Sequence, residues 1–364
     1  MSTTVLPEPA IAAVTVDAFA DRVVSAALGW MDLMAIHLGS QLGWYRALAK
    51  AGPLDADELA ASTGTSPRYA REWLEQQAAG GLLEVAGDVD AQPRRFALTA
   101  PAAEVLIDGT SLSYLEPLAR MLAASGARMD ELIDAYRTGS GVSWERLGRH
   151  ARESQADMNR PWFDDMPRVL ADDEPTARVL SRPGARIADV GMGFGWSSIA
   201  LAQAHPGLTV EGFDVDHESV ETARANAAAA GVADRVRFHE VDAAHLPEFG
   251  PFDGVFAFEC LHDMPHPVSV LAAAREALAP GGVAVIMDEA AADRFGSDAD
   301  ELERLLYGFS LFVCLPDGMS HAPSAGTGTV MRADTLRGYA RSAGWQGADV
   351  VVPEFGMWRF YRLS

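Results

Sequence analysis

The stretch that decides the fold is Ile187-Ala188-Asp189-Val190-Gly191-Met192-Gly193-Phe194-Gly195-Trp196-Ser197. Its apolar start predicts a strand, and the apolar residues 198–204 that follow it predict a helix. The alternating glycines between them let the backbone turn sharply and come close to a ligand, which the free N–H groups at the helix N-terminus can bind. The nicotinamide-binding pattern G-x-G-x-x-G is not met, because Trp196 occupies the place of the third glycine.

Strands and helices alternate from Arg186 onward, which is typical of a parallel sheet covered on both faces. Apolar runs predict strands at Arg186–Val190, Leu208–Phe213, Val236–Glu240, Phe252–Phe258, Gly282–Met287, Ala348–Val352 and Trp358–Tyr361. Only residues 353–356 separate the last two, so a hairpin is expected there, with an antiparallel last strand. The predicted fold class is α/β, with a Rossmann-like sheet.

A mainly helical module is expected before this sheet. Apolar residues recur at three- and four-residue steps over residues 16–38, and Asp55 with Glu58 forms a capping box for a second helix. Ser66-Pro67 begins another helix, and two short strands are expected over residues 82–85 and 95–98. Helices at a tight turn followed by a hairpin are the outline of a winged helix.

Charge and helix amphipathicity narrow the role of this module. Residues 1–110 contain seven Arg or Lys against fourteen Asp or Glu, so the basic face that a DNA-binding module needs is missing. We therefore expect a structural or dimerising role and no nucleic acid partner. The apolar stripe of residues 16–38 is wide, and it is buried either in a partner subunit or within its own monomer.

Length and composition bound the remaining choices. A chain of 364 residues suggests two domains. The net charge of −22 repels phosphate backbones and anionic lipid, whereas a cationic ligand would be attracted. No run of eighteen apolar residues and no signal-peptide pattern occurs, so we expect a cytoplasmic protein without a membrane partner. The two cysteines, Cys260 and Cys314, allow neither a disulfide framework nor a cysteine zinc site.

Further motifs follow the glycine loop in a fixed order. They are Gly212-Phe213-Asp214-Val215-Asp216, Val241-Asp242-Ala243, Phe252-Asp253, Phe258-Glu259-Cys260-Leu261-His262-Asp263 and Ala279-Pro280-Gly281-Gly282. Together with the loop they resemble the class I S-adenosylmethionine-dependent methyltransferases. With the winged helix in front, the chain resembles the plant-type and actinobacterial small-molecule O-methyltransferases, which dimerise through that domain.

The resemblance implies a domain plan and a set of ligands. Residues 1–110 would be a winged-helix dimerisation domain, residues 111–180 a helical linker contributing to the active-site cleft, and residues 181–364 the cofactor-binding domain. The implied cofactor is S-adenosylmethionine, with S-adenosylhomocysteine as its product. The implied partners are a small-molecule substrate of secondary metabolism and a second copy of the chain.

The resemblance also assigns cofactor-binding residues. An acid at the end of the second strand, Asp214 beside Val215, would bind both ribose hydroxyls, since a carboxylate accepts two hydrogen bonds. Alternatively, Asp214 or Asp216 is only a solvated acid at the strand end. Asp242 beside Ala243 would meet the adenine amino group or else cap the following turn. Gly191, Gly193 and Gly195 would form the loop itself, and Asp189 would organise it and help to hold the methionine end. Glu259 would contact the ligand or only pair locally, and Phe163 and Met166 would pack on the adenosine and substrate or belong to the core.

The candidate catalytic residues follow the fourth and fifth predicted strands. Transfer of a methyl group to a hydroxyl requires removal of its proton. His262 lies at the carboxyl edge of the sheet, where ligands of such sheets bind. It is either the general base, as the resemblance implies, or structural. Asp263, and Asp288 with Glu289 after the fifth strand, would orient its imidazolium or bind substrate.

No metal is expected among these residues, because Pro265 interrupts the helical face that His262 and His266 would need to share. Residues 290–330 are expected to cap the substrate. Aromatic residues there and at the end of the chain would line the pocket or belong to the core: Tyr307, Phe309, Phe312 and Trp358.

The favoured reaction is O-methylation of a small molecule, with His262 as base. Two alternatives remain open. One is a ligand-sensing winged-helix regulator that has kept the methyltransferase fold. The other is an enzyme that binds the cofactor but catalyses N- or C-methylation or a reaction without methyl transfer.

Overall fold

The computed structural model describes residues 15–364, and the chain divides into two compact units, Met1–Ile107 and Asp108–Ser364. Residues 111–180, which the sequence suggested as a linker, are part of the second unit.

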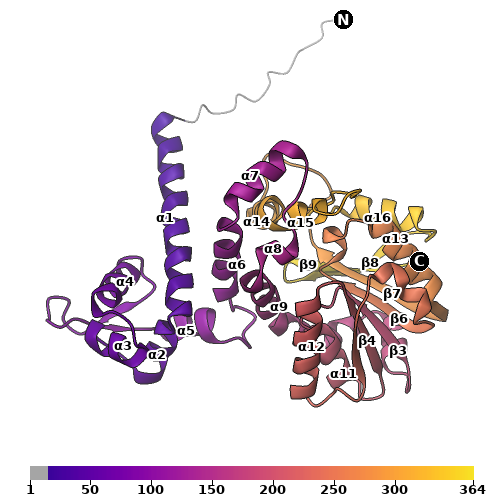
Figure 1. Cartoon of the computed structure of the whole chain (residues 1–364), viewed down its shortest axis with the longest axis horizontal. Helices are drawn as coiled ribbons and strands as arrows, with labels where there is room; N and C mark the ends of the chain where they lie inside the picture. The colour runs from indigo at the N-terminus through magenta and orange to yellow at the C-terminus, as the bar shows by residue number, and fades with distance from the viewer. Residues whose placement is uncertain (1–14) are drawn as a thin grey trace, which may run out of the picture. The chain divides into compact units, whose positions relative to one another are not determined.

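The first unit has the predicted order of helices followed by a hairpin (Figure 1). Its elements are α1 (Val16–Gln41), α2 (Trp44–Ala51), α3 (Ala56–Thr63), α4 (Pro67–Ala79), β1 (Glu84–Ala86), β2 (Arg95–Ala97) and α5 (Ala100–Ile107). The capping box is present, because the Glu58 N–H donates to Asp55 and the Asp55 N–H donates to Glu58. The core is built around the buried rings of Trp44, Tyr45 and Trp73.

Helix α1 leaves most of its apolar side chains exposed, and Gly39 is its one buried residue. It packs on α2 and α4 near its C-terminal end, where Trp73 Nε1 donates to the Ala35 carbonyl at 2.9 Å. By length and composition alone, α1 is also apolar enough to cross a membrane. The sequence analysis excluded a membrane-spanning helix because no run of eighteen apolar residues occurs. That criterion missed α1, which is apolar on average although polar residues interrupt it. Within the described part of its unit, nothing covers the apolar face from Phe19 to Met31.

The second unit contains one seven-stranded sheet of order β5-β4-β3-β6-β7-β9-β8. Its strands are β3 (Arg186–Val190), β4 (Thr209–Asp214), β5 (Val236–Glu240), β6 (Phe252–Phe258), β7 (Leu278–Glu289), β8 (Ala348–Phe355) and β9 (Trp358–Leu363). Strand β9 runs antiparallel to both β7 and β8, which confirms the predicted antiparallel last strand. Strand β7 is longer than predicted and includes Asp288 and Glu289, which therefore end the strand instead of following it.

Helices cover both faces of this sheet, as predicted (Figure 1). One core layer lies under α11 (Trp196–Ala204) and α12 (His217–Ala229), and includes the fully buried Leu201 and Ala223. The other lies under α13 (Pro267–Ala277) and α16 (Ala333–Ser342), and includes Leu271 and Leu336. Burial on both faces explains why the central strands have no alternation of polar and apolar residues.

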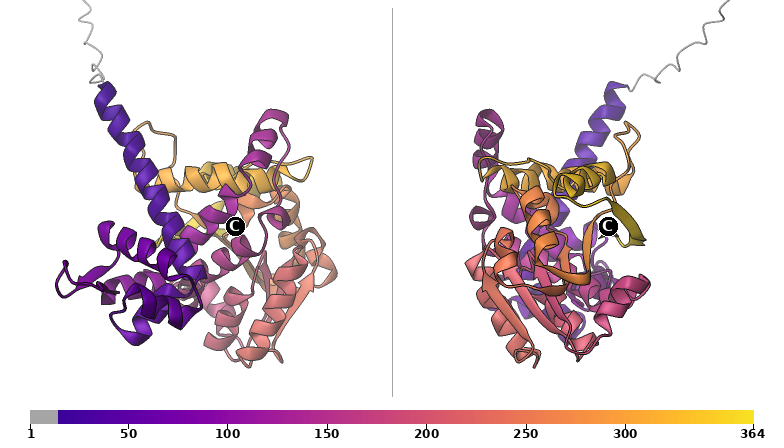
Figure 2. Two further views of the ribbon diagram at one scale, coloured as in Figure 1. Left: turned by 60° about the vertical axis from the view of Figure 1, so that its left-hand side comes forward. Right: turned by 90° about the vertical axis from the view of Figure 1, so that its right-hand side faces the viewer.

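The remaining helices are α6 (Glu116–Gly126), α7 (Met129–Thr138), α8 (Trp144–Leu147), α9 (Arg149–Leu170), α10 (Glu174–Leu180), α14 (Glu301–Phe309) and α15 (Leu315–Met319). A single π-helical turn, Ser310–Cys314, joins α14 to α15. We call residues 301–319 the cap segment; it lies at one end of the sheet (Figure 2). Residues 142–144, at the start of α8, bind the cap segment. The Val142 N–H donates to the Pro316 carbonyl at 2.9 Å, and the Trp144 N–H donates to Asp317 Oδ1 at 2.7 Å.

Candidate active site

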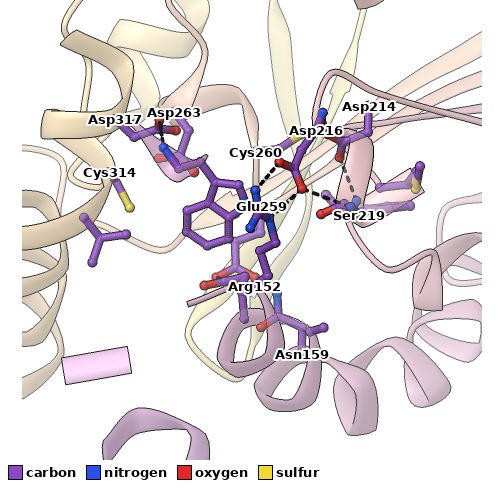
Figure 3. Close-up of a pocket in the computed structure, with 18 of the residues that line it drawn as sticks. Arg152, Asn159, Asp214, Asp216, Ser219, Glu259, Cys260, Asp263, Cys314 and Asp317 are labelled. Atoms are coloured by element: carbon purple, nitrogen blue, oxygen red, sulfur yellow. Dashed lines mark hydrogen bonds and ion pairs between the residues drawn. The ribbon is translucent and has the colours of Figure 1, made fainter. Parts of the chain in front are cut away.

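A cavity of about 760 Å³ opens at the carboxyl ends of strands β3, β4, β6 and β7 (Figure 3). Helix α9, the cap segment and the loops after these strands complete its wall. Ligands of doubly wound sheets bind at this edge, because the strand ends and the helix N-termini meet there.

The glycine loop forms a tight cradle at one end of this cavity. Gly191, Gly193 and Gly195 all have positive φ, which side chains other than glycine rarely adopt. A Cβ on Gly191 would lie 2.7 Å from the Cβ of Cys260, and one on Gly195 would lie 2.6 Å from the Phe238 ring. Gly191 and Gly193 line the cavity, whereas Gly195 supports the loop from behind. The loop therefore brings bare backbone to a ligand.

Asp189 is fully buried beside the loop and does not line the cavity. It organises the loop through its hydrogen bonds. Its Oδ2 accepts hydrogen bonds from the hydroxyls of Ser197 and Ser198, both at 2.6 Å. Its Oδ1 is buried without a partner, and burial raises the pKa of this carboxyl to about 6.

The structure separates the roles of Asp214 and Asp216, which the sequence left open. Asp216 accepts both guanidinium hydrogen bonds of Arg152, at 2.7 and 2.6 Å, and caps α12 through the Ser219 N–H. Each oxygen of Asp214 accepts one backbone N–H at 2.9 Å, from Gly193 and from Asp216. A carboxylate has about four acceptor positions, so Asp214 keeps capacity for a ribose while Asp216 is committed to the scaffold.

Helix α9 supplies a polar face that the sequence analysis missed. Arg152, Gln155 and Asn159 line the cavity at steps of three and four residues, a helical spacing that could have revealed them. The predicted Phe163 continues the same row and also lines the cavity. Met166, the next residue on this face, is fully buried in the core and does not reach the cavity.

Glu259 is held by this face. It is the one residue other than glycine with positive φ, at 53°, among residues 15–364, which is a strained conformation typical of functional sites. Gln155 Nε2 donates to its Oε1 at 3.1 Å, and Asn159 Nδ2 donates to its Oε2. Burial raises the pKa of Glu259 to about 7. The Oδ1 of Asn159 is buried without a hydrogen-bond partner, so it is available to accept a hydrogen bond from a ligand beside Glu259.

His262 is buried among three carboxylates. Its Nδ1 lies 3.0 Å from both Asp288 Oδ1 and Glu289 Oε2, and its Nε2 lies 3.1 Å from Asp263 Oδ1. Burial alone would lower the pKa of the imidazole, but attraction to Asp263, Glu289 and Asp288 outweighs it and holds that pKa well above 6.5. His262, Asp263 and Glu289 line the cavity, whereas Asp288 lies behind the ring. The structure thus brings together all four predicted catalytic residues.

The structure places other predicted residues away from the cavity. Asp242 is exposed and accepts the Ala244 N–H at 2.8 Å, so it caps the following turn, and neither it nor Ala243 lines the cavity. Of the predicted aromatic residues, Phe309 lines the cavity, while Trp358 belongs to the core. Trp144, Cys314 and Asp317, which also line it, were missed because only the packing of the cap segment brings them there.

Two overlapping groups of side chains have the spacing of metal ligands: His262 with Asp263 and Cys314, and His262 with Asp288 and Glu289. Ion pairs and hydrogen bonds already connect these residues, so the contacts require no ion. That the site needs no metal stays a prediction.

Comparison with known proteins finds a matching family model for part of the chain and several similar methyltransferases. Residues 187–282 match the family described as "Methyltransferase domain". The chain is 31% identical over 181 residues to 27-O-demethylrifamycin SV methyltransferase of Amycolatopsis mediterranei, covering 46% of this chain and 65% of that one, which is less than two thirds of its length. Acetylserotonin O-methyltransferase of Mus musculus is 29% identical over 286 residues, covering 73% and 72% of the two chains.

Solved structures extend the likeness of fold to almost the whole chain. Human N-acetylserotonin methyltransferase, solved in complex with S-adenosylmethionine, superposes with a TM-score of 0.71 at 19% identity, covering 97% of this chain and 99% of that one. The domain that matches contains the glycine loop, Asp214 and His262. Residues 187–282 thus match a methyltransferase domain, and the chain as a whole shares the fold of these methyltransferase structures.

Proposed function

We propose that this chain transfers a methyl group from S-adenosylmethionine to a hydroxyl of a small molecule. The observation that carries the proposal is a single cavity whose lining includes Gly191, Gly193 and Asp214 as well as His262. Such a cavity holds donor and acceptor together, and alignment is the main requirement of an in-line methyl transfer.

The residues present fit the cofactor. Gly191 and Gly193 offer bare backbone, Asp214 offers acceptor capacity for a ribose, and Asn159 offers an unpartnered oxygen beside Glu259. When bound, S-adenosylmethionine supplies a methyl group activated by a positively charged sulfur. The acidic wall of the cavity suits that charge.

His262 is the proposed proton acceptor. Its Nδ1 faces Asp288 and Glu289, which stabilise the imidazolium that forms when the ring takes the hydroxyl proton. Because Asp263, Glu289 and Asp288 raise the pKa of the ring, the neutral base is populated at a higher pH than for an ordinary histidine. Asp288, which lies behind the ring, is a positioning residue.

Two further proposals concern the first unit. The exposed apolar face of α1 favours a homodimer built through residues 1–110, because a second copy would cover this face. Covering α1 in this way would also keep it from membranes, in line with a cytoplasmic enzyme.

Detection of S-adenosylhomocysteine by mass spectrometry tests the activity. The full chain, S-adenosylmethionine and a set of phenols should give S-adenosylhomocysteine and a product heavier by one methylene, and the wild type should bind S-adenosylhomocysteine in calorimetry. Absence of cofactor binding would refute the proposal. A tight, salt-dependent complex with duplex DNA would favour the regulator instead.

A further inference from the structure

The end of the cavity away from the glycine loop carries an excess of negative charge. Asp263, Glu289 and Asp317 line it, and the basic side chains that line this end are His262 and His321. Arg152, near the cofactor end, is ion-paired with Asp216 at 2.6 Å. Among the described residues that line the cavity, no lysine and no other arginine is available to balance these carboxylates.

Asp263 and Asp317 lie next to each other across the gap between the sheet edge and the cap segment (Figure 3). A Cβ on Gly318, beside Asp317, would lie 3.0 Å from the Asp263 carbonyl. Burial and repulsion from Asp263 raise the pKa of Asp317 to about 7, although the Trp144 N–H donates to its Oδ1. Repulsion from a nearby carboxylate disfavours the ionised state of Asp317, and a cation bound beside it would favour that state.

Glu289 gives a second, independent indication of a ligand. Its side chain is 4% exposed, yet it lines the cavity. The one proton on His262 Nδ1 is used in the hydrogen bond to Asp288 Oδ1, so Glu289 Oε2 has no hydrogen bond of its own. A buried carboxylate oxygen without a donor is costly, and a donor on the ligand would satisfy it.

Aromatic rings complete this end of the cavity. Trp144 and Phe309 line it together with Asp263 and Asp317. The face of an aromatic ring attracts a cation, and an ammonium group has three donors and no acceptor. Carboxylates with aromatic rings therefore match an ammonium group better than they match a neutral or an anionic group.

We infer that the acceptor molecule carries a protonated amine, which binds between Asp263 and Asp317 while its hydroxyl lies at His262. This inference names the substrate class of the proposed methyl transfer and rests on that proposal. A neutral acceptor would leave Asp317 without a cation and Glu289 Oε2 without a hydrogen-bond donor, and an anionic acceptor would be repelled by the carboxylates of this end.

Three phenols that differ mainly in charge test the inference: tyramine, para-ethylphenol and para-hydroxyphenylacetate. Calorimetry is done on the full chain saturated with S-adenosylhomocysteine, so that no turnover occurs. We expect tyramine to bind with a Kd about tenfold or more below that of para-ethylphenol, and para-hydroxyphenylacetate to bind more weakly than both. Asp317→Asn should lower the affinity for tyramine about tenfold and leave that for para-ethylphenol unchanged, because the amide still accepts the Trp144 N–H.

Glu301→Gln is the matched control, because Glu301 is an exposed acid on the cap segment outside the cavity and its replacement changes net charge equally. It should leave all three affinities unchanged. Tyramine that binds no better than para-ethylphenol, including binding of neither, overturns the inference, as does an unchanged tyramine affinity in Asp317→Asn. Binding of S-adenosylhomocysteine is measured first, so its loss would refute the proposed function, whereas its presence without amine preference refutes only this inference.

Discussion

Replacing Asp214 by alanine tests the assignment of the cofactor site. The carboxylate lines the cavity and accepts backbone N–H groups from Gly193 and Asp216, each at 2.9 Å, which leaves acceptor positions free for the proposed ribose. We expect wild-type affinity for S-adenosylhomocysteine in the micromolar range, on the order of −8 kcal/mol. A hydrogen bond to a charged group contributes about 1.5–3 kcal/mol, so Asp214→Ala should cost about 2 kcal/mol or more, a rise in Kd of about thirtyfold.

Calorimetry with S-adenosylhomocysteine measures this change directly. Asp214→Asn, which keeps one acceptor oxygen and loses the charge, should lie between the wild type and Asp214→Ala. Asp234→Ala, an exposed acid of the same unit that does not line the cavity, is the control and should bind as the wild type does. Thermal unfolding checks that Asp214→Ala is folded, since it also loses contacts that hold the loop. A folded Asp214→Ala that binds with unchanged Kd would refute the assignment.

Four further outcomes are expected. His262→Ala should lower turnover about a hundredfold and leave the Kd for S-adenosylhomocysteine unchanged. The wild-type kcat should rise with pH at a midpoint above 6.5, because the imidazolium, whose pKa is raised, must first lose its proton to act as a base. Near-normal turnover in His262→Ala would make the histidine structural. The pKa of Asp189, about 6 in the folded chain against 3.8 ordinarily, means that the folded state binds more protons between these values, so stability is lost as pH rises through them. Urea unfolding should show Asp189→Asn gaining about 2 kcal/mol relative to wild type between about pH 4.5 and 7.5, and parallel pH profiles would contradict the burial argument. Light scattering should report two subunits for the wild type and one for Leu28→Glu, because the new glutamate places a charge on the exposed apolar face of α1. A wild-type monomer would refute the proposed dimer. A chelator such as EDTA should leave turnover unchanged, and loss of activity restored by a divalent ion would show that the histidine cluster holds a metal.

The sheet could be predicted because its information is local. Each central strand is a short apolar run bounded by turn residues, and strands β3, β5 and β6 have the predicted bounds. The glycine loop and Asp214 were found for the same reason, since a turn with positive φ and an acid at a strand end are visible in a few consecutive residues. Where local pattern was ambiguous, the bounds were less accurate, as in β7, which extends through Asp288 and Glu289.

The acceptor side of the site was decided by tertiary structure alone. Asp317 and Trp144 are far apart in sequence, and they meet because the cap segment pairs with the chain before α8 through Val142 and Pro316. Gly141 permits that pairing, since a Cβ there would lie 2.6 Å from the Ser320 Cα. By contrast, the three acids around His262 were predicted from their places after His262 and at the end of the fifth strand, and the structure brings all three to the ring. Sequence therefore determined the glycine-loop end of the cavity, which neighbouring residues build. The charge and shape of the other end depend on contacts between distant segments, which periodicity and spacing do not encode.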